Sequence, residues 1–537
     1  MVTPLPRALK CDTLSAFNLY FTKKGGGAMH SPASRKPERL WCIFAYSLLI
    51  AAAALFFCSK SSFGYPINDW TDANIYFTIG KGMAQGQLVY RDLYDHKGPL
   101  LYALHALCAL LSPMSFTGVY VLEVLCAAAF LTCVYRILAL YHAQRLAVPA
   151  LALTALIVYT SASFSLGDSA EELCLPLLAY SLCALLRHFK TEFPRRMSAA
   201  QLVCNGLLFG CVFWMKFTLI GLHAAFLLLL FLSQASQQRW KQAFACVGWF
   251  ALGFVASTLP WLLYFGLNGA LLPWLKTYLY DNLFLYSSTE EAAGLLTRIK
   301  AMGRSGLSWL IQNPLYTLPL AGGLLWGACR KHASVWERLC FILPAFVCAL
   351  GVFIGGKSYP YYGLVLAVFA PLGLIPPCLW LHRRLENGFA RSRAVFLSLA
   401  ALFCAACLAL CPVLSPNVQE SFRKPKAETM QYQFAEILSR YKSPTLLNYG
   451  FMDAGFYTAA GIVPNVKYFQ QNNVPLPEML AEQVRYVREG VCDFVVTRGK
   501  QPDCIHDQYE LIATANSPEG YWYEHVYLYK LKSLPVQ

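Results

Sequence analysis

The chain has 537 residues, of which 57% are hydrophobic and only 14% are charged, and its mean hydropathy is +0.43. A soluble protein carries about 25% charged residues, so the composition excludes a soluble globular protein and indicates a polytopic membrane protein. The net charge of +15 is typical of basic loops on the cytoplasmic side of a membrane, and we expect membrane lipid, not nucleic acid, as the partner.

The N-terminal segment, residues 1–39, is polar and contains a Lys-Lys-Gly-Gly-Gly run at 23–27. This composition predicts a disordered cytoplasmic tail. The first apolar run, 40–59, has the length of a full membrane span. It begins too late in the chain for a cleavable signal peptide.

Basic clusters between the later apolar runs serve as cytoplasmic anchors for a membrane domain over 40–414. They predict about eleven spans, at 40–59, 116–135, 146–164, 173–187, 200–214, 217–233, 242–265, 314–329, 338–355, 361–381 and 394–414. The apolar run 99–112 is too short to cross, so we expect a membrane-embedded half-helix there. An odd number of spans places the N-terminus in the cytoplasm and the C-terminus outside.

The composition changes after Ser415, and residues 415–537 read as a soluble extracytoplasmic α/β domain. Helical spacing occurs at 429–441 and 477–489, and strand patterns occur at 446–449, 493–497, 511–515 and 525–531. Cys492 and Cys504 could form a disulfide in an extracytoplasmic unit. The predicted fold class is therefore an all-α polytopic membrane domain followed by a small soluble α/β domain.

A carboxylate-rich segment directly follows the first span, where charges are costly unless they serve a site. Apolar residues at helical spacing predict an interfacial helix over 71–84. Asp72 lies in its first turn, where the helix dipole favours an ionised carboxylate. Asp72 is either a general base or a helix cap, and the residues leave both open. For Asp69 we expect the capping role.

The start of the half-helix at 99–112 carries a second signal. Pro99 fits the first position of a helix, and Lys97 lies just before it. A lysine beside the positive end of a helix suits a phosphate group, although a lysine that extends to the membrane interface is an alternative. We expect His96 to be a hydrogen-bonding loop residue, not a metal ligand.

Other outer segments add further charges and aromatic residues. Carboxylates crowd at Asp168, Glu171 and Glu172, and cations occur at Lys216, Arg298, Lys300, Arg304 and Lys357. The carboxylates have a simpler explanation in a capped helix start, and Tyr361 and Tyr362 have one as interfacial belt residues. A carboxylate base with cations is also what displacing a phosphate leaving group from a sugar requires.

Several catalytic signatures are absent from the sequence. It contains no nucleotide-binding loop and no zinc or Ser-His-Asp signature. A transferase on the outer face has no access to the nucleotide sugars of the cytoplasm, so we expect a sugar donor carried by a lipid, and we expect no cofactor. The sequence does not indicate a divalent cation, although it leaves one open.

Three motifs of the outer segment resemble one protein family: Asp72-x-x-x-Tyr76, Gly82-Met83-x-x-Gly86-x-x-x-Tyr90-Arg91-Asp92 and Asp95-His96-Lys97-Gly98-Pro99-Leu100. They are similar to the first periplasmic loop of bacterial GT-C glycosyltransferases, the membrane enzymes related to lipid A aminoarabinose transferases and protein O-mannosyltransferases. That family often has Lys-Pro-Pro-Leu where this chain has Gly98, and Asp-Glu where it has Asp72-Ala73.

The resemblance implies a hexosyl- or pentosyltransferase of the bacterial inner membrane. It would move a sugar from a polyprenyl-phosphate donor to a glycan or lipid acceptor on the outer face. By the resemblance, Asp72 is the base or orients the acceptor, Lys97 binds the donor phosphate, and Glu171 or Glu172 is a second acidic residue.

The full set of candidate site residues combines the motifs with the other outer charges. Candidate catalytic residues are Asp72, Glu171 and Glu172; phosphate-binding candidates are Lys97, Arg298, Lys300 and Arg304; substrate-binding candidates are Asp95, His96, Lys357, Tyr361 and Tyr362.

Two alternatives to this transferase stay open, a lipid-glycan flippase or transporter and a glycan polymerase or ligase. A transporter should show polar or broken helices near the midplane and internal repeats. The sequence shows few charges inside its spans and no clear repeat, which favours the enzyme.

Overall fold

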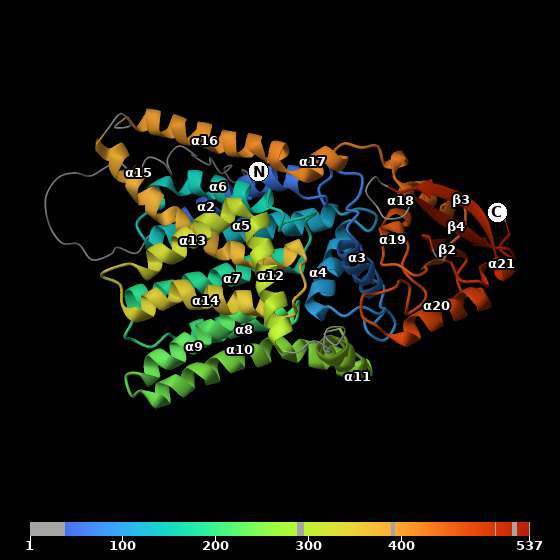
Figure 1. Ribbon diagram of the computed structural model, residues 1–537, viewed down its shortest axis with the longest axis horizontal. Helices are drawn as coiled ribbons and strands as arrows, with labels where there is room; N and C mark the ends of the chain where they lie inside the picture. Colours follow the sequence, from blue (N-terminus) through green and yellow to red (C-terminus); the bar gives the residue numbers. More distant parts are fainter. Residues whose placement is uncertain (1–37, 287–294, 388–391, 500, 518–523, 536–537) are drawn as a thin grey trace, which may run out of the picture.

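The computed structural model describes residues 38–286, 295–387, 392–499, 501–517 and 524–535. The predicted tail lies outside the described residues except for its last two positions. Long helices form one part of the molecule and a small α/β unit forms the other, and two shorter helices lie between them (Figure 1).

A helix occupies each predicted span. These helices are α2 (Glu38–Cys58), α5 (Thr117–Leu140), α6 (Ala147–Tyr159), α7 (Ala170–Arg187), α8 (Ala199–Phe213), α9 (Gly221–Ala235), α10 (Trp240–Leu267), α13 (Pro314–Ala328), α14 (Val335–Phe353), the 3₁₀ segment η6 (Pro360–Leu374) with α15 (Ile375–Asn387), and α16 (Arg393–Leu414). Within the described residues, seven helical stretches are long and apolar enough to cross a membrane. The count of about eleven crossings stays a prediction.

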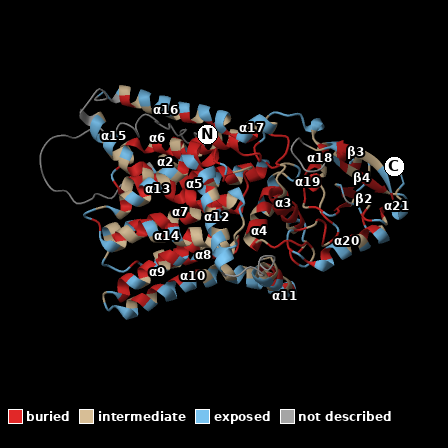
Figure 2. Cartoon of the chain, viewed as in Figure 1, coloured by how far each residue is buried: buried red, intermediate tan, exposed pale blue. Residues whose placement is uncertain are grey.

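The outer helices of this bundle expose apolar side chains. On α10 and α16, Val255 is 56% exposed and Leu402 is 68% exposed, and both helices show pale exposed stretches in Figure 2. Apolar side chains on the surface of a helix suit contact with lipid. A helix also satisfies its backbone polar groups internally, as a lipid environment requires. The protein is therefore a membrane protein by composition and by structure.

The helix α3 (Thr71–Ala84) has the predicted bounds, but its surroundings differ from the prediction. We expected an interfacial helix with one buried face, and the structure buries Ile75 and also the polar Asn74, Thr78 and Lys81. The polar side is covered because the C-terminal unit packs on it. The spacing of residues within α3 could not predict this contact, because the covering residues lie hundreds of positions downstream.

The capping prediction for Asp69 is wrong. The N-cap of α3 is Trp70, and no side chain caps it. Asp69 instead accepts a hydrogen bond from Lys60 Nζ at 2.8 Å, and Lys60 is only 1% exposed. A buried ammonium is costly without a counter-charge, and pairing with Lys60 therefore accounts for the position of Asp69.

The helix α4 (Pro99–Leu111) begins at Pro99, as predicted, and its start is docked on the end of α8. The N–H of Gly98 donates to the carbonyl of Met215 at 3.0 Å, and the N–H of Leu100 donates to that of Trp214 at 3.1 Å. These bonds hold the segment that carries Lys97 against the membrane helices.

Between α10 and α13 the chain forms three helical segments. They are α11 (Leu271–Leu275), the π-helical η4 (Lys276–Leu285) and α12 (Leu295–Gln312). A short helix after the last long one, α17 (Pro416–Ser421), leads into the C-terminal unit.

The C-terminal unit confirms the predicted mixture of helices and strands. Its sheet has the order β1-β2-β4-β3, with β1 parallel to β2 and the other pairs antiparallel. The strands are β1 (Leu446–Asn448), β2 (Phe494–Thr497), β3 (Tyr509–Asn516) and β4 (His525–Leu531), and the helices are α18 (Met430–Leu438), α19 (Phe456–Ala460), α20 (Pro477–Glu489) and α21 (Ile505–Gln508). Cys492 and Cys504 are both free, so the considered disulfide is absent.

A buried polar junction joins this unit to α3. Lys81 Nζ donates to the carbonyls of Tyr457 at 2.8 Å and Ile462 at 3.0 Å, and Thr78 Oγ1 donates to Asp453 Oδ2 at 2.7 Å. Burial lowers the pKa of Lys81 to about 7, against the opposing effect of Asp453. Because buried polar groups are costly without partners, these bonds favour one orientation of the unit on α3.

We predict that Gly98→Ala lowers the thermal stability of the protein. A Cβ at this position would lie 2.0 Å from the Trp214 carbonyl oxygen, so α4 would have to move away from α8. Overpacking of this kind costs about 1–3 kcal/mol. The matched control is Gly248→Ala in α10, where a Cβ would have no heavy atom within 4 Å. Equal unfolding temperatures for both variants in one detergent would contradict the docking described here.

Candidate functional site

Two adjoining cavities lie where α3, α4 and the C-terminal unit meet the long helices. The larger, of about 240 Å³, is called here the basic cavity, and its charged lining residues are Lys97, Lys216, Arg298 and Lys357. The smaller, of about 110 Å³, is called the acidic cavity, and it is lined by Trp70, Thr71, Asp72, Asp95, His96, Lys97, Tyr286, Tyr359, Tyr361, Met452 and Asn473. The two cavities share His96, Lys97 and Tyr286.

Asp72 lies in the first turn of α3 and contributes to the acidic cavity. Its Oδ2 accepts hydrogen bonds from the hydroxyls of Tyr76 and Tyr361, each at 3.1 Å. Since no side chain caps α3, Asp72 is not used as a cap and can act as a base toward the cavity.

Lys97 belongs to a chain of charged side chains between the cavities. Its Nζ lies 3.2 Å from His96 Nε2, and His96 Nδ1 lies 3.3 Å from Asp95 Oδ1. Asp95 also accepts hydrogen bonds from Tyr102 and Asn472. The predicted interaction of His96 with loop neighbours is therefore present.

The charges of this chain stabilise one another. Burial disfavours the ionised form of Asp95, but the neighbouring His96, the positive charge of Lys97 and the hydrogen bond from Tyr102 outweigh it, so the pKa of Asp95 lies below its usual range. Burial likewise works against the charge on Lys97, but Asp72 and Asp95 raise the pKa of Lys97. The site thus holds a lysine cation between two carboxylates.

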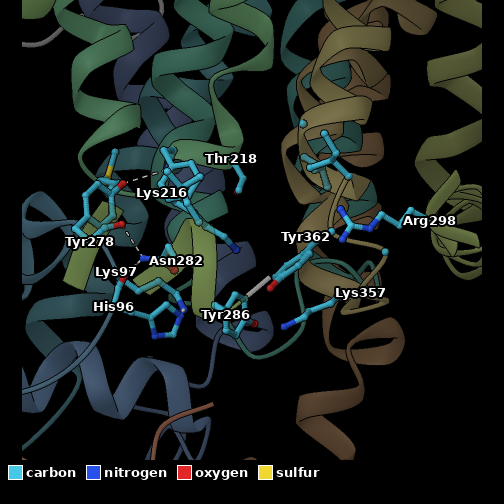
Figure 3. A pocket seen from close by; sticks show the side chains of 18 residues that line it. His96, Lys97, Lys216, Thr218, Tyr278, Asn282, Tyr286, Arg298, Lys357 and Tyr362 are labelled. Carbon is cyan, nitrogen blue, oxygen red and sulfur yellow. Dashed lines mark hydrogen bonds between the residues drawn. The ribbon is translucent and has the colours of Figure 1, made fainter. Parts of the chain in front are cut away.

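The cations of the basic cavity converge from three connecting segments and from the helix α12. Figure 3 shows Lys97 and Lys216 on one side, with Arg298 and Lys357 on the facing side. Lys357 Nζ lies 3.3 Å from the centroid of the Tyr286 ring, and Lys216 Nζ lies 3.9 Å from that of Tyr362. Aromatic rings attract cations in this geometry, so the rings hold the ammonium groups at the cavity wall.

Tyr286 connects the two cavities and was not identified from the sequence. Burial opposes ionisation of its hydroxyl, but Lys97, a hydrogen bond from Tyr362 and Lys357 outweigh this effect and lower its pKa. Its ring lies 5.1 Å from that of His96. Tyr286 belongs to no sequence motif, so the sequence could not have identified it as a site residue.

The structure separates the three predicted cations of α12. Arg298 lines the basic cavity, whereas Lys300 and Arg304 line neither cavity and are exposed. The spacing of these three residues along one helix could not show which of them reaches the cavity.

The two predicted glutamates also lie in different surroundings. Glu171 pairs with Lys216 at 2.5 Å and so contacts a wall residue of the basic cavity. Glu172 is buried elsewhere, where its Oε2 accepts from the N–H of Asp168 at 2.9 Å. Ser169 caps α7 through the N–H of Glu172, as the simpler explanation expected, but that explanation also expected a solvated helix start, and the three carboxylates of this loop are buried. Neither glutamate lines a cavity.

The C-terminal unit supplies wall residues that the sequence did not reveal. Met452 and Asn473 line the acidic cavity together with Trp70. They come from a segment of the chain that was assigned only to the soluble domain. Their participation follows from the docking of that domain on α3, which no local pattern encodes.

Comparison with known proteins agrees with this geometry. A family model described as dolichyl-phosphate-mannose-protein mannosyltransferase matches residues 96–264, a stretch that begins at the charged loop of the site. No protein sequence of established function matches the chain.

Solved structures resemble the chain at low sequence identity. The crystal structure of ArnT from Cupriavidus metallidurans bound to undecaprenyl phosphate has 14% identity and a TM-score of 0.54, over 92% of this chain and 98% of that one. Its apo state has 13% identity and a TM-score of 0.52, over 91% and 97%. AglB from Archaeoglobus fulgidus, in complex with an inhibitory peptide and a dolichol-phosphate, has 13% identity and a TM-score of 0.47, over 86% and 70%.

The ArnT comparisons extend over more than nine-tenths of this chain, so the likeness in fold is not confined to the long helices. The mannosyltransferase match and this shared fold together confirm the predicted resemblance to GT-C membrane glycosyltransferases and, with it, the prediction of a glycosyltransferase.

Proposed function

We propose that this chain transfers a sugar from a polyprenyl-phosphate donor to a glycan or lipid acceptor on the outer face of the bacterial inner membrane. The observation that carries the proposal is the pair of cavities that share Lys97, one with Asp72 and the other with three more cations. A carboxylate on one side and cations on the other are the two elements that displacement of a phosphate needs. The bound undecaprenyl phosphate of the ArnT structure supports a lipid-linked donor.

In the proposed reaction the donor phosphate lies in the basic cavity, where the cations neutralise its charge. Asp72 accepts the proton of an acceptor hydroxyl, and the hydroxyl oxygen forms a bond to the anomeric carbon. The bond between that carbon and the phosphate oxygen breaks, and polyprenyl phosphate leaves with the electron pair. Attack from the side opposite the phosphate inverts the anomeric configuration. The proposed chemistry uses neither a cofactor nor a metal ion.

The proposed orientation places the N-terminus in the cytoplasm and the C-terminal unit outside. It is supported by the basic clusters between the apolar spans. A site on the outer face has no access to nucleotide sugars of the cytoplasm, which is why the donor must be carried by lipid.

The proposal is tested by incubating the purified protein with a panel of polyprenyl-phosphate sugars and measuring the release of polyprenyl phosphate. We expect release from at least one donor, and we expect Asp72→Asn to reduce it about a hundredfold or more, as for loss of a general base. The control is Asp92→Asn, because Asp92 lies on the same segment, pairs with Arg91 and lines neither cavity. Near-normal turnover of Asp72→Asn would remove this carboxylate from the mechanism.

Lys97→Ala should weaken use of the donor. A hydrogen bond to a charged group contributes about 1.5–3 kcal/mol, which corresponds to a tenfold to hundredfold loss at about 1.4 kcal/mol per factor of ten. Donor kinetics are measured beside the unfolding temperature of the same variant. Unchanged kinetics with a lowered unfolding temperature would mean that Lys97 anchors the fold and does not bind phosphate.

The cations of α12 provide a matched comparison. Arg298→Ala should raise the donor concentration needed for half-maximal release about tenfold, by the same free-energy argument. Lys300→Ala should leave it unchanged, because Lys300 lies on the same helix but lines neither cavity. The two variants are compared in one titration of donor, and equal effects would contradict the assignment of Arg298.

A further inference from the structure

The acidic cavity has a wall that comes from the C-terminal unit. Asn473 and Met452 lie far downstream of Asp72 in the sequence, but they line the same cavity as Asp72. Asn473 is exposed, and its side chain makes no hydrogen bond to any residue that the structure describes. Its amide therefore presents one acceptor and two donors without a partner from the protein.

The position of this wall is fixed by its neighbours. Asn472 donates to Asp95 Oδ1, and the N–H of Tyr94 donates to the carbonyl of Lys467 at 3.1 Å. Asn472 is 5% exposed and Asp95 is 1% exposed, so their hydrogen bond is shielded from water. A residue next to such a bond is held at a defined place on the cavity, which a ligand-binding residue requires.

The remaining lining combines aromatic rings with hydrogen-bonding groups. The rings of Trp70 and Tyr361 lie 5.0 Å apart, and those of Tyr359 and Tyr361 lie 5.8 Å apart. Apolar and aromatic walls with a few placed polar groups are the usual composition of a small-molecule site. A sugar ring fits such a lining, because its C–H face can pack on a ring while its hydroxyls bond to carboxylate and amide.

The charged lining and the volume of the acidic cavity further restrict the class of ligand that it can bind. Asp72 and Asp95 both line this cavity, and like charges repel an anion at close range. The cations other than Lys97 line the basic cavity instead. The volume of about 110 Å³ is well below the about 300–1,000 Å³ of sites for drug-sized ligands, which suits a single ring unit.

We propose that the acidic cavity is an acceptor subsite for one neutral sugar unit, and that Asn473 of the C-terminal unit determines which sugar it accepts. The acceptor is thus the sugar end of a glycan, not a phosphate group. This inference rests on the proposed transfer from a polyprenyl-phosphate donor. It adds that the C-terminal unit takes part in acceptor selection.

The test measures binding separately from transfer. The full-length protein in lipid nanodiscs is titrated with methyl glycosides of common neutral hexoses and N-acetylhexosamines, and with methyl phosphate, by saturation-transfer NMR. We expect at least one glycoside to bind and methyl phosphate not to compete with it. Asn473→Ala should weaken the glycoside about two- to tenfold, the effect of one neutral hydrogen bond of about 0.5–1.5 kcal/mol.

The control variant is Asn465→Ala, an exposed asparagine of the same unit whose side chain donates to the Val491 carbonyl at 3.3 Å. It should leave glycoside binding unchanged, and both variants should bind undecaprenyl phosphate as the wild type does. Equal weakening by both variants, no binding of any glycoside, or displacement of the glycoside by methyl phosphate would overturn the inference.

The outcomes also separate this inference from the transfer on which it rests. Release of polyprenyl phosphate by a protein that binds no glycoside would overturn the sugar subsite alone. Glycoside binding that depends on Asn473, in a protein that processes none of the donors, would support a sugar-binding cavity and overturn its role as an acceptor subsite.

Discussion

The site depends on two opposite charges, those of Lys97 and Asp95, that lie close together in a place largely shielded from water. Lys97 lies next to His96 and Asp95, and Asp72 contributes to the field that raises the pKa of Lys97. Burial works against the charge of Asp95 and against that of Lys97, and neighbouring groups outweigh it in both cases. The segments that carry these groups must therefore be in place together.

That requirement explains why the C-terminal unit is joined to the membrane helices by polar contacts. The amide of Asn472 completes the surroundings of Asp95, and Lys81 is bonded to two carbonyls of the unit. An apolar residue in place of Asn472 would leave Asp95 with one donor fewer. The junction is thus part of the electrostatics of the site as well as a support for it.

The parts that the sequence predicted are those that depend on local periodicity. The bounds of α3, the start of α4 at Pro99 and the strands of the C-terminal sheet follow from spacing and from proline placement. The sequence marks Asp72 and Lys97 as candidates because each lies at a helix start and within a motif of the resemblance, and both line the acidic cavity. Asp69 was misjudged because its partner, Lys60, is not a helical neighbour, and Asn473 and Tyr286 were missed because only tertiary packing brings them to the cavities.

The glycine at position 98 shows how a departure from the family motif can be read physically. Proline has no N–H, so it could not make the bond from Gly98 to the Met215 carbonyl. A side chain would also meet the Trp214 carbonyl, which leaves no room for a Cβ. With glycine at this position the chain lacks the rigidity of a second proline, but α4 can approach α8 more closely. Because Lys97 directly precedes this contact, the backbone of the phosphate-binding candidate is anchored by hydrogen bonding and close packing, and the side chain stays free to serve both cavities.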